Sequence, residues 1–187
     1  MNLAELATAC AGCRKCGLAN TRTRTVFGIG KTTPGGILLV GEGPGEQEDM
    51  KGEPFVGPAG RLLDAMLAAI GIERGQVYIA NVVKCRPPGN RNPAADEIAA
   101  CLPYLQSQIR LLQPRLIVAL GKVAANALLA TDDVKMAAMR GRMHQYEGID
   151  LLVTYHPSYY LHQPQQKIEG WKDLVKIRKS AASGTPR

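Results

Sequence analysis

The chain has 187 residues, of which 45% are hydrophobic and 21% charged, and its 23 Lys and Arg against 16 Asp and Glu give a formal net charge of +7. This length favours one domain, and the composition excludes a disordered, collagen-like or coiled-coil chain. The basic balance fits a nucleic-acid partner and a basic soluble enzyme equally well. No apolar run approaches the roughly 18 residues of a membrane span and no signal-peptide pattern opens the chain, so we expect a cytoplasmic protein that does not bind membranes.

Short apolar runs alternate with amphipathic segments along the chain. Unbroken apolar runs of four or five residues predict strands covered on both faces, over 37–40, 77–80, 116–120 and 151–155. Helical spacing of apolar residues predicts helices over 62–70, 98–112, 122–129 and 168–179. This order predicts a single domain over residues 1–180 with a three-layer α/β/α fold around a mainly parallel, four-stranded sheet, and a disordered tail over 181–187.

Three loops rich in glycine, proline or aromatic residues follow predicted strands, over 41–60, 85–93 and 156–164. Ligands bind beyond the carboxyl ends of the strands in an open α/β sheet, so these loops predict one site. The first loop also concentrates carboxylates, which indicates local chemistry or, alternatively, a solvated acidic turn. Five of the sixteen acidic residues lie there: Glu42, Glu46, Glu48, Asp49 and Glu53.

Five cysteines point to a metal site. Cys13 and Cys16 form a C-x2-C pair, and Cys85 and Cys101 form a second pair with fifteen residues between them. A cytoplasmic chain keeps its thiols reduced, which favours metal binding or catalysis over disulfides. Four thiolates suit zinc or a four-iron four-sulfur cluster, with a slight base-rate preference for zinc. Cys10 is left over, and the alternative is a set of buried structural cysteines, above all Cys101 on its apolar stripe.

Several motifs resemble those of the family 4 uracil-DNA glycosylases, the thermostable iron–sulfur type. They read GEGPGEQED over 41–49, GEPFVG over 52–57, YIANVVKCRPP over 78–88 followed by NR over 90–91, RG over 140–141 and HPSYYL over 156–161. The resemblance extends from about residue 13 to 171. It implies hydrolysis of the N-glycosidic bond of uracil in DNA to start base-excision repair, by a monomer that needs no magnesium and no dissociable cofactor. It also implies one four-iron four-sulfur cluster on Cys13, Cys16, Cys85 and Cys101, which reverses the preference for zinc.

The same resemblance assigns three residues to the flipped base. Phe55 offers a flat face on which the base stacks. The carboxamide of Asn81 matches the polar edge of uracil and not that of cytosine. The imidazole of His156 stabilises the charge that uracil carries away. The alternatives are a core-plugging Phe55, an Asn81 that caps its strand and a satisfied structural histidine.

Further residues of the two glycine-rich loops complete the expected site. Gly41, Glu42 and Gly43 offer backbone N–H groups to uracil. Gly43 stands where the best-known family of uracil glycosylases carries an aspartate that orients the attacking water. Glu42 and Asn90 therefore become the candidates for positioning the attacking water, beside His156 as the third catalytic residue. Glu48 guards the C5 edge of uracil against a thymine methyl group, or is simply an exposed carboxylate.

Basic and aromatic residues of the later loops are the expected DNA contacts. Basic groups contact phosphates, which gives affinity that does not depend on sequence. Tyr159, Tyr160 and Leu161 are candidate wedges that fill the vacated base stack. The expected set is Lys84, Arg86, Arg91, Ser158, Tyr159, Tyr160 and Leu161.

Two other classes of function compete with this interpretation. One is a non-catalytic, DNA-binding iron–sulfur module associated with replication or repair, which would not require the complete set of Glu42, Phe55, Asn81 and His156. The other is a metabolic enzyme that cradles a nucleotide phosphate with residues 41–45. That loop lacks the lysine of a Walker A motif and carries carboxylates that repel phosphate.

Overall fold

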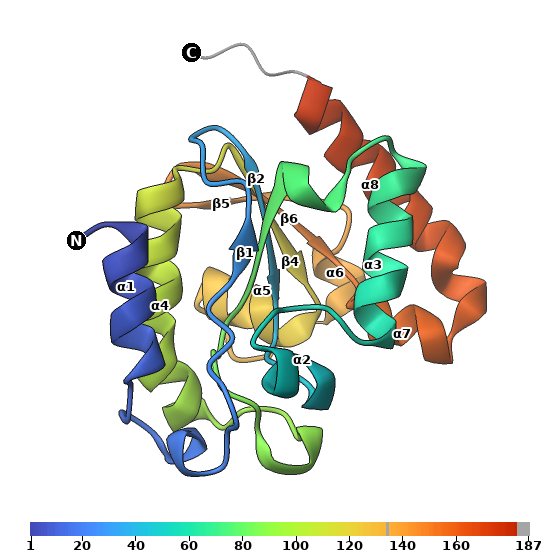
Figure 1. Ribbon diagram of the computed structural model, residues 1–187. Coiled ribbons are helices and arrows are strands. Elements are labelled where there is room, and N and C mark those ends of the chain that lie inside the picture. The colour runs from blue at the N-terminus through green and yellow to red at the C-terminus, as the bar shows by residue number, and fades with distance from the viewer. Residues whose placement is uncertain (134, 183–187) are drawn as a thin grey trace.

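A computed structural model describes residues 1–133 and 135–182 of the chain. Its centre is a six-stranded sheet in the order β1-β3-β2-β4-β6-β5, with helices packed on both faces (Figure 1). The strands are β1 (Ile29–Gly30), β2 (Ile37–Gly41), β3 (Val77–Asn81), β4 (Leu116–Leu120), β5 (Met143–Tyr146) and β6 (Ile149–Thr154). The helices are α1 (Leu3–Ala11), α2 (Glu46–Lys51), α3 (Pro58–Ala69), α4 (Ala95–Leu112), α5 (Lys122–Leu129), α6 (Met136–Met139), α7 (Pro157–His162) and α8 (Lys167–Ala182).

The four predicted strands form the parallel centre of this sheet. β2 pairs in parallel with β3 and β4, and β4 pairs in parallel with β6, so the carboxyl ends of all four strands meet at one edge. The expected number of strands was too small, because β1 and β5 add an antiparallel strand at each side. β1 has only two residues and β5 alternates exposed with half-buried positions, so neither contains the apolar run that predicted the other four.

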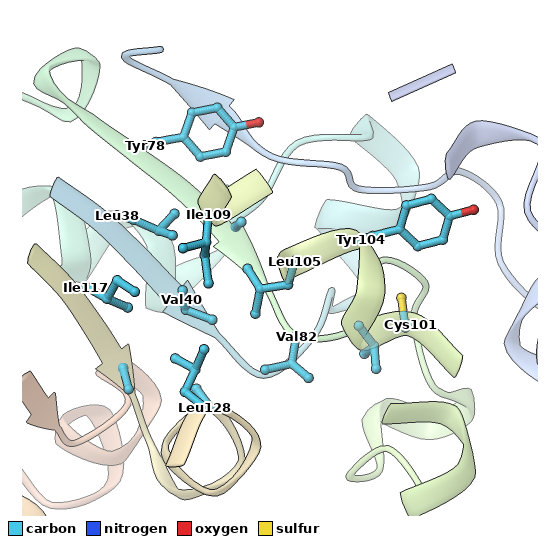
Figure 2. Packing of buried hydrophobic residues seen from close by; sticks show 14 of the residues in the cluster. Leu38, Val40, Tyr78, Val82, Cys101, Tyr104, Leu105, Ile109, Ile117 and Leu128 are labelled. Carbon is cyan, nitrogen blue, oxygen red and sulfur yellow. The ribbon is translucent and has the colours of Figure 1, made fainter. Parts of the chain in front are cut away.

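Alternate residues of the central strands belong to two separate apolar clusters, one on each face of the sheet. Leu38 and Val40 point to the face that α1, α4 and α5 cover, where Leu105 of α4 and Leu128 of α5 pack against them (Figure 2). Ile37 and Leu39 belong to the opposite cluster, which α3 and α8 cover. Because both faces are covered, these strands read as continuous apolar runs, and the expected three-layer architecture is confirmed.

The two ends of the described chain differ from the sequence-based prediction. The unpredicted helix α1 begins with a capping box, in which the side chains of Asn2 and Glu5 each accept the other's backbone N–H. Helix α8 continues to Ala182, so residues 181–182 are helical and not part of a disordered tail; the remainder of that expected tail, 183–187, lies outside the described residues. Within the described residues, no helix is both long and apolar enough to cross a membrane.

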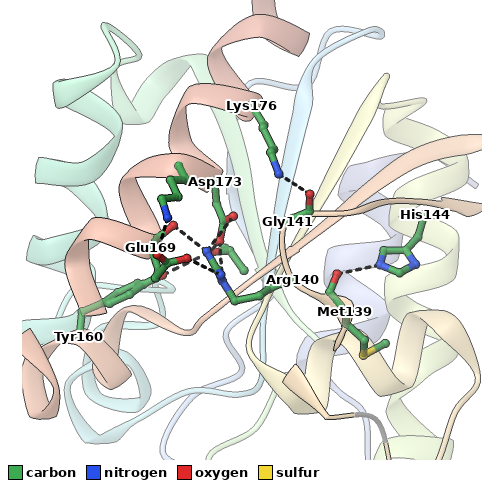
Figure 3. A network of polar contacts seen from close by, with 10 residues as sticks. Met139, Arg140, Gly141, His144, Tyr160, Glu169, Asp173 and Lys176 are labelled. Atoms are coloured by element: carbon green, nitrogen blue, oxygen red, sulfur yellow. Dashed lines mark hydrogen bonds and ion pairs between the residues drawn. The ribbon is translucent and has the colours of Figure 1, made fainter. Parts of the chain in front are cut away.

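A buried ion network fastens α8 and α7 to the end of β6 (Figure 3). The guanidinium of Arg140 donates to Asp173 at 3.2 Å and to Glu169 at 2.8 Å, and its side chain is 14% exposed against 1% for Asp173. Asp173 also accepts the hydroxyl of Thr154 at 2.8 Å, and Thr154 lies 3.3 Å from the hydroxyl of Tyr160. The network therefore holds the strand end that precedes His156 against two helices.

Replacing Arg140 by methionine is expected to lower the free energy of unfolding by about 3 kcal/mol, because the Asp173 carboxylate is left buried without its cation. Urea denaturation of the two proteins measures this difference. The matched control is Lys172→Met, which removes only the exposed ion pair with Glu169 and should leave the urea midpoint almost unchanged. Equal, small shifts for both variants would show that the network does not contribute to stability.

Candidate active site

A cavity of about 490 Å³ opens at the edge of the sheet where the four parallel strands end. Residues that follow β2, β3 and β6 line it, so the structure brings the three predicted loops to one place. The lining residues of the expected site are Glu42, Gly43, Glu48, Phe55, Asn90, Arg91, His156 and Ser158.

A fourth loop, after β4, completes the cavity and was missed in the sequence. Gly121 and Lys122 line the cavity at the start of α5. Gly121 has a φ of +92°, and a Cβ atom there would lie 3.0 Å from the Cβ of His156, so only glycine allows this close approach. The available signal was a glycine directly between an apolar run and a helix, the same arrangement that marked the other loops.

Phe55 lies between the core and the cavity. Its side chain is 6% exposed and belongs to the apolar cluster under α3 and α8, yet it also lines the cavity. Its ring is stacked against that of His156, with 5.5 Å between the ring centroids. The ring therefore packs into the core and also reaches the cavity, and its stacking on a base stays a prediction.

Asn81 and Gly41 lie beside Phe55, but neither is among the residues that line the cavity. Asn81 is the register partner of Gly41, and a Cβ atom at Gly41 would come within 2.4 Å of Asn81 Oδ1 and 2.6 Å of the Phe55 ring. Asn81 is 1% exposed, and its Oδ1 has no hydrogen-bond partner among the described residues. Buried acceptors are normally paired, so this oxygen lacks the partner that a buried carboxamide usually has.

The imidazole of His156 is held as a neutral N–H donor. Its Nδ1 accepts the backbone N–H of Ser158 at 3.2 Å and lies 2.7 Å from the Ser158 hydroxyl. A backbone N–H can only donate, so the ring proton must sit on Nε2. Burial lowers the pKa of His156 from 6.5 to about 4, which keeps the ring uncharged at neutral pH.

The two candidates for water positioning both line the cavity. Burial raises the pKa of Glu42 above its usual value. The Asn90 Oδ1 accepts the Nε–H of Arg86 at 2.7 Å, which leaves the amide N–H groups of Asn90 free of that contact. A Cβ atom at Gly43 would lie 2.7 Å from Val83 Cγ2, so the packing of Val83 favours glycine at this position.

Glu48 has a different place from the one expected. It lines the cavity, but its carboxylate accepts the backbone N–H groups of Val56 at 2.9 Å, Gly57 at 2.8 Å and Gly45 at 3.2 Å. It is therefore neither a free guard of a base edge nor an exposed carboxylate. It ties the two glycine-rich parts of the first loop together.

Two of the expected DNA contacts are buried, which corrects that part of the prediction. Lys84 is 1% exposed, and its ammonium donates to the Asn81 carbonyl at 2.8 Å and to Gln108 at 2.6 Å. Tyr160 is also 1% exposed and packs beneath α8 beside Thr154. Because both side chains are buried, neither residue can reach a DNA backbone. The motifs in the sequence do not reveal that these long side chains turn inward.

The other expected contacts stay near the rim of the cavity. Arg91 forms a two-point ion pair with Glu97 and remains 46% exposed, whereas Arg86 is 25% exposed and lies 3.8 Å from Glu46. Tyr159 and Leu161 are exposed on α7 at 36% and 43%. Ser158 is committed to His156, so its first role is to orient the imidazole.

All five cysteines line one small cavity between α1, the 13–22 segment and α4. The cations Lys15, Arg22 and Lys84 lie around it. Burial raises the pKa of Cys101 to about 11 and that of Cys10 to about 12. Within the described residues, no three His, Cys, Asp or Glu side chains are arranged to hold a single metal ion.

Comparisons with known proteins place this geometry in context. The family described as the Uracil DNA glycosylase superfamily matches residues 27–175. The chain is 44% identical over 183 residues to a protein of Pyrobaculum aerophilum named type-4 uracil-DNA glycosylase, covering 94% of this chain and 92% of that protein. Proteins with the same name from Archaeoglobus fulgidus and Thermotoga maritima are 42% and 46% identical, covering 88% and 80% of this chain and 86% and 78% of those proteins.

Proposed function

This chain belongs to the uracil DNA glycosylase superfamily, and we propose that it is a uracil-DNA glycosylase, which takes uracil out of the base stack and hydrolyses its N-glycosidic bond to leave an abasic site. The observation that carries the proposal is the convergence of the Phe55 ring, the Asn81 carboxamide and the His156 imidazole at one end of the sheet. An aromatic ring suits the face of a flipped base, and hydrogen-bonding side chains suit its edges.

Recognition of uracil follows from the unpaired oxygen of Asn81. Uracil carries a proton on N3, which can donate to Asn81 Oδ1, while the amide N–H of Asn81 donates to uracil O4. Cytosine has an unprotonated N3 and an amino group instead of O4, so it would leave both groups of the carboxamide without a partner. The cost of such unpaired buried groups gives the selectivity, and the face of Phe55 supports either base by stacking.

Bond cleavage needs a donor for the charge that develops on the departing base. The Nε2–H of neutral His156 meets this need when it points at uracil O2, because a fixed dipole in a buried site stabilises an anion without having to reorganise. The Ser158 backbone and hydroxyl fix the ring orientation from the Nδ1 side. No proton transfer from His156 is required.

Attack on the sugar needs a positioned water. Glu42 lines the same cavity, and its carboxylate orients the water and accepts its proton. The amide of Asn90, whose oxygen is held by Arg86, is the second group that contacts this water. We expect the DNA strand to pass over the rim, where Arg91 and Lys122, each paired with a carboxylate in the free protein, are the cations that line the cavity.

The test of this function is incubation of the purified protein with a labelled oligonucleotide that contains one uracil, followed by alkali, which cuts at abasic sites. We expect cleavage at uracil and none in matched strands with thymine or cytosine at that position. A non-catalytic DNA-binding module would bind all three strands and leave them intact, and that result would overturn the proposal.

We further propose that Cys13, Cys16, Cys85 and Cys101 hold a four-iron four-sulfur cluster, which serves as a structural cross-link. The donor set fits, because thiolate ligands of such a cluster need nearby positive charge and N–H donors. Arg22 donates to Cys85 Sγ and the Lys84 backbone N–H to Cys101 Sγ, each at 3.2 Å. The four cysteines join the N-terminal segment, the loop after β3 and α4, and so brace the strand end that carries Asn81.

Substituting Cys101 by serine is expected to abolish the visible absorbance and most of the bound iron and sulfide of the purified protein, since a cluster with three thiolates is easily lost. Cys10→Ser is the matched control, because Cys10 lines the same cavity but lies outside the proposed ligand set, and it should retain both. Iron and sulfide analysis beside the visible spectrum measures the outcome. A colourless wild-type protein that contains zinc would contradict the assignment.

A further inference from the structure

Phe55 adopts a backbone conformation that non-glycine residues rarely take. Its φ is +53°, in the left-handed region. The strain persists only where the surrounding structure specifies it, and such residues are concentrated at binding and catalytic sites. The position of the ring in the cavity therefore depends on whatever holds this stretch of backbone.

Arg74 holds the backbone from the side away from the cavity. It begins the short 3-10 helix Arg74–Gln76, which precedes β3, and it is not among the cavity-lining residues. Its guanidinium donates to the carbonyl oxygen of Phe55 at 3.1 Å and to that of Pro54 at 2.5 Å. Asp64 of α3 accepts a further bond at 2.9 Å, which fixes the plane of the guanidinium.

Glu48 holds the same backbone from the cavity side. Its Oε1 accepts the N–H groups of Val56 and Gly57, so the peptide unit between Phe55 and Val56 has its oxygen bonded to a cation and its N–H bonded to an anion. Hydrogen bonds to charged groups are the stronger ones in proteins. Gly60 makes room for this arrangement, because a Cβ atom there would lie 1.8 Å from the Phe55 oxygen.

We propose that Arg74 is a positioning residue for uracil excision, which acts by holding Phe55 in the strained conformation that presents its ring to the base. This inference rests on the proposed function. The planar guanidinium can bond two successive carbonyl oxygens and a carboxylate at once, whereas a lysine offers one charged centre and cannot reproduce the geometry. Misplacing a binding group by about 1 Å can cost on the order of 100-fold in rate.

The test compares Arg74→Met and Arg74→Lys with the wild type in single-turnover excision at saturating protein. We expect Arg74→Met to lower the rate roughly tenfold to 100-fold while the concentration for half-maximal DNA binding changes by less than about twofold. Arg74→Lys should recover only part of the rate, and it keeps the comparison possible if the methionine variant folds poorly. The matched control, Arg178→Met on the exposed face of α8, should react at the wild-type rate.

A double-mutant cycle with Phe55→Ala separates positioning from a general loss of structure. If Arg74 acts through the ring, Arg74→Met should slow the reaction of the wild type but add almost nothing in the Phe55→Ala background. Independent, multiplicative losses would overturn the proposal.

A readout without activity separates this inference from the proposed function. Hydrogen exchange of the backbone amides at 55–57 should speed up in Arg74→Met while the melting temperature stays close to that of the wild type. Unchanged exchange would show that Arg74 does not hold the Phe55 backbone, even if uracil is excised. A wild type that excises no uracil refutes the proposed function and with it the role of Arg74 in catalysis. The exchange result then decides whether Arg74 holds the Phe55 backbone.

Discussion

Replacing His156 by alanine is expected to lower the single-turnover rate of uracil excision about 100- to 1000-fold, the loss typical of removing one donor to a developing anion. The effect should fall on the chemical step, because the Nε2–H of His156 strengthens its bond only as uracil becomes an anion. DNA affinity, measured by fluorescence anisotropy with a strand that carries no uracil, should change little. A variant that binds DNA weakly yet cleaves at the normal rate would make His156 a DNA contact instead.

His144 provides the matched control for this substitution. Its Nε2 contacts the carbonyl oxygen of Met139 (Figure 3), and His144 is not among the residues that line the cavity. His144→Ala should therefore keep the rate within about twofold, as expected for a residue that touches neither substrate nor lining.

The pH dependence tests the neutral state of His156. Because burial lowers its pKa from 6.5 to about 4, the imidazole remains a neutral donor above about pH 5. The excision rate of the wild type should therefore not change around pH 6.5 through titration of His156. The pKa of Glu42 is raised by burial, so the excision rate should fall at acid pH as the Glu42 carboxylate becomes protonated. Between pH 6.5 and 4 the unfolded chain binds a proton that the folded chain does not, so His156 lowers stability as the pH falls through this range.

Replacing Asn81 by alanine is expected to lower the excision rate by a similar factor, about 100- to 1000-fold, and to reduce the preference for uracil over cytosine. The reason is the unpaired Oδ1 of Asn81, which in the wild type gains a partner only when a base with an N3–H enters. Single-turnover rates on strands with uracil and with cytosine, measured beside the melting temperature, separate recognition from folding.

Asn126→Ala is the corresponding control. This carboxamide on α5 contacts Thr131 and the carbonyl of Asp132, away from the cavity lining. It should leave both the rate and the selectivity unchanged. A near-normal rate for Asn81→Ala would remove Asn81 from base recognition and leave the strand-end cap as its role.

The parallel centre of the fold could be read from the chain because burial on both faces leaves a local signature. Strands β2, β3, β4 and β6 are unbroken apolar runs, and α4 has an apolar stripe that Pro114 follows. The edge strand β5 has no such run, since one side of it meets solvent and its pairing with β6 decides its conformation. Helix α1 had a readable signal in the Asn2–Glu5 capping box that apolar periodicity overlooked.

Some residues of the candidate site could likewise be predicted from the sequence, and others could not. Residue type and motif were enough to propose Phe55, Asn81, His156 and the four cysteines, because stacking, edge recognition, anion stabilisation and cluster binding each need particular chemical groups. The inward turn of Lys84 and Tyr160 was not readable, because a long polar side chain near a strand end is exposed or buried according to the partners that surround it, such as Gln108 and Thr154.

Residue type and local hydrophobic pattern were enough to establish which chemical groups this protein carries and that its four central strands run in parallel. Only the tertiary structure decided how those groups are held. Phe55 keeps its strained conformation through a contact with Arg74, and Lys84 turns inward to Gln108. Both contacts join segments that lie far apart along the chain and that folding brings together, so no local pattern encodes them.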